Sequence, residues 1–216
     1  MLENIKKILV AYDGSECANA ALDDLQQAGL PREAEAIVMS VTEYAFLPPN
    51  SDLFVSDSPE ILFSQWGLAE QLAKQATCRI QSMFPNWKVT AETGLGSAAS
   101  EINRLACGWS PDLLLIGSHG RTALGRFILG SVSQRVVTDA PCSVRVARHR
   151  LKEAALPLRL LLGMDGSVDA YAMVHAVAAR TWPEKTEAKI VTAIGPFFHA
   201  NPLLVEEEEA QARRIQ

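Results

Sequence analysis

The sequence has no dense block of lysine and arginine, and its 216 residues carry a formal net charge of −5. A nucleic-acid partner is therefore not expected, because such partners need a concentrated basic surface. The four cysteines are scattered without a C-x-x-C pair, which indicates free thiols in a reducing compartment. No apolar run reaches the length of a membrane span, and the N-terminus lacks the apolar core of a signal peptide. These absences predict a cytoplasmic protein that is not inserted in a membrane.

The histidines and acidic residues give no sign of a dedicated metal site. His119, His149, His175 and His199 share no spacing typical of metal ligands, and no set of carboxylates indicates a Mg²⁺ site. His119 lies in a glycine-rich loop, but the sequence shows no partner that would orient it as a general base. We therefore expect no catalytic residue and no metal ligand in this chain.

The composition favours an aliphatic α/β core, because 48% of the residues are hydrophobic but only 6% are aromatic. Short apolar runs alternate with helical patterns, which predicts a parallel sheet with right-handed crossovers and helices on both faces. Gly94 and Gly96 are expected in the turn after the third strand, and residues 44–59 in a loop that is a lid or a mobile excursion. The expected strands are 5–12, 34–42, 87–92, 113–116 and 144–146, and the expected helices are 16–28, 61–84, 98–107 and 132–138.

The segment 111–147 combines a buried strand, a glycine-rich loop and a helix start. Gly117 and Gly120 follow the strand, and Gly130-Ser131 precedes the helix. Glycines let backbone N–H groups approach an anion, and the first turn of a helix leaves N–H groups unpaired. The segment therefore predicts a phosphate site. A simpler interpretation makes Ser131 the N-cap of the helix, with Gln134 completing a capping box, and the two roles are compatible.

The spacing of these glycines resembles a known signature. It matches the G-x2-G-x9-G-S/T pattern of the ATP-binding branch of the universal stress protein family, and neither the Walker A nor the dinucleotide pattern. The resemblance covers about residues 4–147. It implies an α/β fold with a doubly wound, five-stranded parallel sheet of strand order 3-2-1-4-5, the adenine nucleotide alpha hydrolase-like fold. Strand one then lies beside strand four, and Asp13 and Gly117 flank one crevice at the carboxyl ends of the strands.

The resemblance also implies a nucleotide site that holds ATP, with any Mg²⁺ arriving together with the nucleotide. Asp13 would contact the adenosine and the Val41 backbone the adenine edge, although Asp-Gly-Ser taken alone is typical of a turn or a helix cap. Arg121 and Arg126 could neutralise phosphate charge. The implied binding residues are Ala11, Asp13, Val41, Gly117, Ser118, His119, Gly120, Arg121, Gly130, Ser131, Val132 and Ser133.

The start of the chain is repeated later in the sequence. Residues 158–167, LRLLLGMDGS, match residues 6–15, KKILVAYDGS, and the same offset aligns the second strands. We therefore expect a complete domain over 1–148, a linker over 149–157 and a partial second copy over 158–216. That copy would hold strands 158–164 and 187–194 with a helix 168–181 between them, and a helical start from Leu204.

The second copy lacks the phosphate motif, so no nucleotide is expected beside Asp165. Half a parallel sheet leaves an exposed edge. This predicts either a truncated chain or a half-domain that packs against the first domain or against another subunit. The resemblance itself implies a homodimer, with 142–147 as its edge strand, or an intramolecular pairing of the two repeats.

Three functions remain open at this point. A complete phosphate motif without hydrolytic groups favours an ATP-binding sensor or assembly module in a stress response. A slow ATPase or an enzyme that phosphorylates its own Ser131 or Ser133 would need a positioned metal and an orienting group, so at most weak turnover is expected. A nucleotide-free protein–protein scaffold would better suit a sequence whose glycines had been lost.

Overall fold

The computed structural model of the chain describes residues 5–43, 59–120, 129–148 and 157–193. The chain divides into two compact units, one over Ile5–Glu153 and one that takes in Ala154–Gln216. The division falls in the expected linker, most of which lies outside the described residues, as do the expected loop after Glu43 and the helical start from Leu204. The two units are considered separately below.

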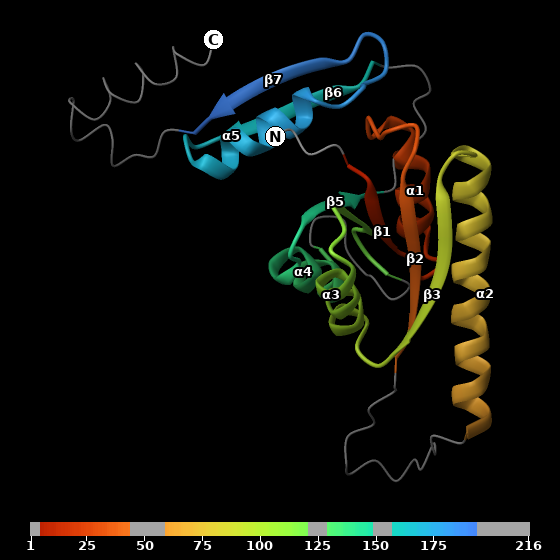
Figure 1. Ribbon diagram of the computed structural model, residues 1–216. Helices are drawn as coiled ribbons and strands as arrows, with labels where there is room; N and C mark the ends of the chain where they lie inside the picture. Colours follow the sequence, from red (N-terminus) through yellow and green to blue (C-terminus); the bar gives the residue numbers. More distant parts are fainter. Residues whose placement is uncertain (1–4, 44–58, 121–128, 149–156, 194–216) are drawn as a thin grey trace, which may run out of the picture. The chain divides into compact units, whose positions relative to one another are not determined.

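The first unit is built on a parallel sheet with the strand order β3-β2-β1-β4-β5 (Figure 1). This confirms the predicted order 3-2-1-4-5. β1 pairs with β2 on one side and with β4 on the other, so the strand order reverses between β1 and β4. The strands are β1 (Lys7–Ala11), β2 (Glu35–Thr42), β3 (Lys88–Leu95), β4 (Leu113–Gly117) and β5 (Ser143–Ala147).

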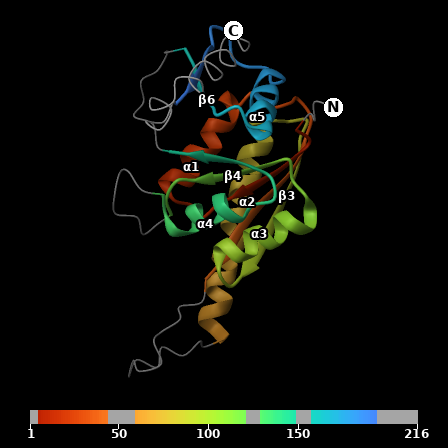
Figure 2. The ribbon, with the colours of Figure 1, turned by 90° about the vertical axis from the view of Figure 1, so that its left-hand side faces the viewer.

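Helices cover both faces of this sheet (Figures 1 and 2). Ile8 and Val10 of β1 pack in one buried cluster with residues of the first two helices, and Leu9 and Ala11 pack in a second cluster with residues of the third and fourth. Because both faces are buried, the strand is an uninterrupted apolar run rather than an alternating one. The helices are α1 (Glu16–Asp24), α2 (Pro59–Met83), α3 (Ala98–Trp109) and α4 (Ser131–Asp139), and a 3₁₀ turn over Leu25–Gln27 follows α1.

One expectation about the third strand was wrong. Gly94 was expected in a turn, but β3 continues through it and pairs Gly94 with Val41 of β2. The glycine lies close to side chains, since an added Cβ would lie 2.8 Å from Met39 Cε and 3.2 Å from Glu101 Cβ, so a larger residue would need these side chains to shift. The strand therefore reaches Leu95, three residues beyond its predicted end.

The second unit repeats the start of the first in register. It consists of β6 (Arg159–Met164), α5 (Val168–Ala178) and β7 (Glu187–Thr192). β6 pairs with β7 from Arg159↔Glu187, just as β1 pairs with β2 from Lys7↔Glu35, at the same offset of 152 residues. β6, α5 and β7 thus have the same local fold as the corresponding part of the first unit.

Side-chain hydrogen bonds are repeated as well. Ser15 Oγ accepts from the N–H of Ala18, and Ser167 Oγ accepts from the N–H of Ala170, both at 3.1 Å. The burial of the two copies differs. Leu9 is fully buried, whereas Leu161, at the same register position, is 72% exposed.

This difference predicts unequal effects of the same substitution. Leu9→Ala should lower the free energy of unfolding by about 2–5 kcal/mol, because it leaves a cavity in a packed core. Leu161→Ala, the matched control, should change it by less than about 1 kcal/mol. Urea unfolding of the purified chain measures both, and equal losses for the two variants would contradict this burial difference.

Candidate functional site

A cavity of the first unit opens at the carboxyl ends of β1, β2 and β4, where the strand order reverses. Its volume is about 870 Å³. Parallel sheets of this type bind ligands at this position, because the loops after neighbouring strands diverge there. Of the predicted binding residues, those that line it are Ala11, Asp13, Val41, Gly117, His119, Gly120, Gly130, Ser131, Val132 and Ser133.

The segment that follows β4 returns to the end of its own strand. The N–H of Ser118 donates to the carbonyl of Ala147 at 2.7 Å, and the N–H of Gly130 donates to the carbonyl of Ser118 at 2.9 Å. Gly117 and Gly130 therefore reach the same mouth of the cavity, although residues 121–128 between them lie outside the described residues. Arg121 and Arg126 fall in that gap.

The N-terminus of α4 differs from those of α1, α3 and α5. In these three helices a first-turn N–H donates to a side-chain oxygen, of Ser15, Glu43 and Ser167 respectively. The N-cap of α4 is Gly130, and among the described residues no side chain caps it. Its first-turn N–H groups and the positive end of its dipole are thus available to an anion.

The predicted capping box at Ser131 and Gln134 was therefore wrong. Ser131 is already the first residue of α4, and the N–H of Gln134 donates to the carbonyl of Gly130 at 2.8 Å. A capping serine has extended backbone and precedes the helix. Here Gly130 has that extended conformation, with φ −61° and ψ 154°. Ser131 lines the cavity instead.

The three motif glycines permit close approach between parts of the protein itself. A Cβ on Gly117 would lie 2.8 Å from the backbone N of Ala18 and the backbone C of Cys17. A Cβ on Gly120 would lie 2.9 Å from Asp13 Oδ2, and one on Gly130 would lie 3.4 Å from His119 Cα. The glycines thus bring the end of β4, the start of α1 and the start of α4 together around the cavity.

Asp13 combines the two roles considered for it. Its Oδ1 accepts from the N–H of Ser15 at 3.0 Å, which is the turn expected of Asp-Gly-Ser. Gly14 has φ +78°, a conformation that glycine adopts readily. The other oxygen, Oδ2, lies next to Gly120, and Asp13 lines the cavity. The turn fixes the carboxylate while one oxygen remains at the mouth.

The hydroxyls of Ser15 and Ser133 fix the loop after β4, a role that was not predicted from the sequence. Ser15 Oγ donates to the carbonyl of His119 at 3.3 Å, besides capping α1. Ser133 Oγ donates to the carbonyl of Gly117 at 2.7 Å, and Ser133 is 3% exposed. The Ser133 hydroxyl thus holds the end of β4 against α4. The repeated Asp-Gly-Ser was the only sequence signal that could have pointed to Ser15.

Among the predicted site residues that the structure describes, Ser118 is the one that does not line the cavity. It is buried, and its Oγ lies 3.0 Å from His119 Nδ1 and 3.6 Å from Cys17 Sγ. Its side chain is used to pack the loop onto α1, because the residues of an extended segment point alternately to opposite sides. His119, the next residue, lines the cavity.

The other end of the cavity is largely apolar. Met39, Val41, Ile102 and Ile116 line it on the face that carries α3 and α4. Leu68 and Leu72 of α2 line it on the opposite side, together with Tyr12. Burial raises the pKa of the Tyr12 phenol, whose hydroxyl donates to Asn19 Oδ1 at 2.9 Å. The cavity therefore offers backbone N–H groups at one end and apolar side chains at the other.

Neither a metal site nor a membrane-spanning helix was expected from the sequence, and the structure bears on both. In the part of the chain that the structure describes, no group of three or more His, Cys, Asp and Glu residues could hold a metal ion. None of the described helices is long and apolar enough to cross a membrane.

The sheet order is that of the adenine nucleotide alpha hydrolase-like fold. A sequence model of the universal stress protein family matches residues 4–148. The chain belongs to the universal stress protein family.

Similar proteins cover different shares of the chain. Universal stress protein MJ0531 of Methanocaldococcus jannaschii is 30% identical in an alignment of 161 positions that covers 70% of this chain and 87% of the relative. The structure of the universal stress protein UspA from Lactobacillus plantarum has a TM-score of 0.55 at 27% identity and covers 68% of this chain and 99% of its own. A universal stress protein structure from Archaeoglobus fulgidus has a TM-score of 0.62 at 21% identity and covers 96% of this chain and 74% of its own. Because its identity to this chain is only 21%, the similarity to the Archaeoglobus fulgidus structure shows the fold alone.

The contacts of the motif glycines predict which of them is needed for folding. Gly117→Ala should lower the free energy of unfolding by about 1–3 kcal/mol, because its Cβ meets backbone that cannot move aside. Gly130→Ala, with no contact closer than 3.4 Å, should lower it by about 1 kcal/mol or less. Thermal unfolding followed by circular dichroism compares the two, and a Gly117→Ala protein as stable as wild type would contradict the close packing.

Proposed function

We propose that the first unit binds ATP in this cavity, and that the bound nucleotide controls the conformation or assembly of the protein in a stress response. The observation that carries the proposal is the N-terminus of α4. It opens on the cavity with its first-turn N–H groups uncapped by any described side chain. Such a terminus favours a negatively charged group, and a phosphate accepts several N–H donors at once.

The polarity of the cavity supports a nucleotide rather than a free phosphate. The polyphosphate would lie against Gly130, Ser131 and Val132, and the base would lie among apolar residues such as Ala11 and Val41. Asp13, held by Ser15 between these two ends, is suited to accept hydrogen bonds from ribose hydroxyls. His119 and Gly120 would then flank the sugar and the first phosphate, while Ser118 contributes through the fixed loop.

Adenine nucleotides are bound by some universal stress proteins. One structure is a complex with cAMP, and another, from Arabidopsis thaliana, has AMP bound. Their TM-scores to this chain are 0.45 and 0.43. The proposal of ATP as the ligand therefore rests on the cavity, and ATP itself, an accompanying Mg²⁺, a homodimer and a cytoplasmic location stay predictions.

Binding without efficient hydrolysis is supported by the two carboxylates in the described lining. Asp13 Oδ1 is engaged by the N–H of Ser15, and Glu43 Oε1 accepts from the N–H of Ala98 at 3.1 Å. Glu43 is thereby used to fix a helix start, and the free oxygen of Asp13 is the one proposed to accept from the ribose. Hydrolysis needs a group that orients the attacking water and a positioned metal, and the described lining has no further carboxylate for these roles, so a sensor fits these contacts better than an ATPase.

The second unit supplies the control for this proposal. We infer that it is an incomplete copy of the first. Asp165 Oδ1 accepts from the N–H of Ser167 at 2.9 Å, as Asp13 does from Ser15. Hydrogen bonding by the side chain and by the backbone N–H of Ser167 lowers the pKa of Asp165 below its usual value. The described residues of this unit contain no counterpart of the 117–131 segment, so the same turn exists there without the cradle.

The pair Asp13→Ala and Asp165→Ala separates ligand binding from turn stability. Both variants lose the turn hydrogen bond, but only Asp13→Ala should weaken ATP binding, by roughly tenfold to hundredfold, since it removes a charged acceptor worth about 1.5–3 kcal/mol. Isothermal titration calorimetry with ATP measures this. Equal affinities for both variants and wild type, or no ATP binding by wild type, would refute the proposed site.

The place of the phosphates predicts an order of affinities. ATP should bind more tightly than ADP, and ADP more tightly than AMP, because each phosphate adds charge near the start of α4. Raising the ionic strength should narrow these differences. Titrations at low and high salt test this, together with Ser131→Ala, which should reduce the preference for ATP. AMP binding as tightly as ATP would show that the phosphate tail does not lie there.

A further inference from the structure

Asn19, near the start of α1, joins several parts of the cavity wall. Its side-chain N–H groups donate to the carbonyls of Gly14 and Ser15, at 3.3 and 3.0 Å. Its Oδ1 accepts from the Tyr12 hydroxyl at 2.9 Å and from Arg79 Nη1 at 3.0 Å. An asparagine side chain has two N–H donors and one oxygen with two lone pairs. All of its hydrogen-bonding capacity is thus used, and it connects the turn after β1 with helix α2.

The turn itself does not require this asparagine. In the second unit the corresponding residue, at the offset of 152 residues, is Tyr171. The turn over Asp165–Ser167 nevertheless forms there with the same hydrogen bonds. Gly166 has φ +80°, against +78° for Gly14. The hydrogen bonds of the asparagine in the first unit therefore serve a purpose other than forming the turn.

The partners of Asn19 are also specific to the first unit. Met164 takes the place of Tyr12 in the second unit. The described residues of that unit contain no counterpart of α2. Among the described residues, the arrangement around Asn19 thus occurs in the unit that also has α2 and the cavity.

Helix α2 forms one wall of the cavity and is held by polar contacts on either side of it. The residues of this α2 wall are Gln65, Leu68, Ala69 and Leu72. At one end, Thr42 Oγ1 donates to the carbonyl of Gln65 at 3.2 Å. At the other, Arg79 donates to Asn19. Leu68, Leu72 and Arg79 share one helix face, since positions i, i+4 and i+11 coincide at about 3.6 residues per turn.

The middle of the α2 wall rests on the turn after β1. A Cβ on Gly14 would lie 2.8 Å from Leu72 Cδ2. Tyr12 lines the cavity on the same side and is 9% exposed. A displacement of α2 would widen the cavity beside Tyr12 and Leu72. It would not alter the start of α4, because α4 packs on the other face of the sheet.

Apolar burial already holds α2 to the sheet. Ala73, Ala76 and Ile80 are at most 1% exposed and belong to the buried cluster that includes β1. The side chains of the Arg79–Asp23 ion pair are 38% and 67% exposed, and such pairs contribute little to stability. The polar contacts are therefore better suited to set the position of the α2 wall than to keep the helix folded.

We propose that Asn19 is a positioning residue for the nucleoside part of the ligand. Through Tyr12 and Arg79 it fixes the α2 wall, and the cavity thereby selects a nucleoside polyphosphate over an inorganic polyphosphate. This role rests on the proposed function, since it assigns a nucleoside-side wall to the same cavity. The phosphates would be held by N–H groups at the start of α4, which the contacts of Asn19 do not reach.

The variant Asn19→Ala removes all four hydrogen bonds. The affinity for ATP should fall by roughly fivefold or more, because the α2 wall loses its fixed position. The affinity for inorganic tripolyphosphate, which has the phosphates of ATP but no nucleoside, should stay within about twofold. Isothermal titration calorimetry measures both affinities. A thermal unfolding midpoint within about 5 °C of wild type shows that the fold is kept.

Arg79→Met is the decisive variant, because Arg79 does not line the cavity and can act on the ligand only through the wall. It should also weaken ATP binding without weakening tripolyphosphate binding. Combined with Asn19→Ala it should add little further loss, since the two residues share one contact.

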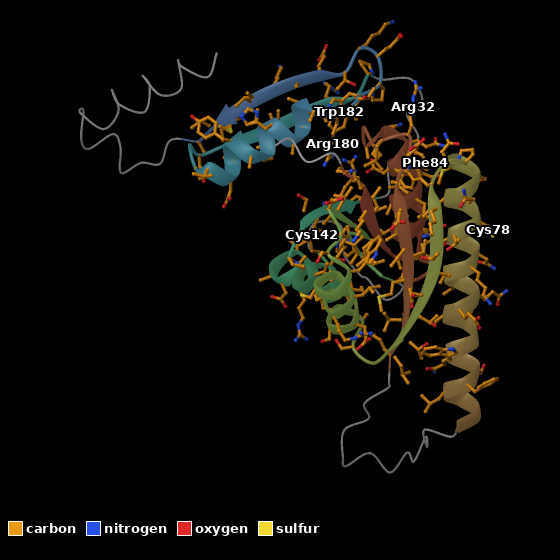
Figure 3. The ribbon with its side chains drawn as sticks, in the orientation of Figure 1. Arg32, Cys78, Phe84, Cys142, Arg180 and Trp182 are labelled. Carbon is orange, nitrogen blue, oxygen red and sulfur yellow. The ribbon has the colours of Figure 1, made fainter. Side chains whose placement is uncertain are left out.

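The matched control is Lys74→Met, which removes a positive charge from the same helix and breaks the exposed Lys74–Glu70 ion pair. Lys74 precedes by one helical turn Cys78, which is exposed on the outer side of α2 (Figure 3). Lys74→Met should leave both affinities unchanged.

The outcomes separate this role from the nucleotide site itself. ATP affinities of Asn19→Ala and Arg79→Met equal to that of wild type would overturn the positioning role and leave the site standing. Equal losses for ATP and tripolyphosphate would overturn it too, as would a wild-type chain that binds ATP but no tripolyphosphate, because the two ends of the cavity would then not act separately. A wild-type chain that binds neither ligand would overturn the proposed function and this role with it.

Discussion

The site depends on one close backbone contact, between the end of β4 and the start of α1. Gly117 lies so near to Cys17 and Ala18 that no side chain fits between them. This approach places the loop after β4 against the turn after β1, where Ser15 can donate to the carbonyl of His119. The carboxylate of Asp13 and the N-terminus of α4 then open on one cavity. A wider separation of the two strand ends would leave the same residues without a common site.

Much of this could be predicted from the sequence, because the signals were local. Apolar runs such as Leu113–Ile116 and glycines at fixed spacing after a strand predicted the fold, and the resemblance supplied the strand order that the structure confirms. The errors concern residues whose role is decided by distant neighbours. Gly94 pairs with Val41 inside β3 rather than forming a turn, and Gly130 takes the capping place expected of Ser131. Local patterns carry no information on such contacts.

The two units show how one backbone design can serve different surfaces. The turn at Asp165, the cap at Ser167 and the strand register all repeat those of the first unit. These features depend on hydrogen bonds close in sequence, so they persist without the rest of the sheet. Burial does not repeat, because it depends on neighbours contributed by later parts of a domain.

The uncapped beginning of α4 also bears on the energetics of the ligand-free protein. A helix whose first amides lack acceptors is prone to fraying in its first turn, and β5, which follows α4, is the last strand on its side of the sheet. An anion seated there would serve as the cap that no described side chain provides. Binding of the anion would then slow hydrogen exchange in β5, because the helix that precedes this edge strand would be anchored. In that sense the ligand completes the secondary structure rather than merely filling a space.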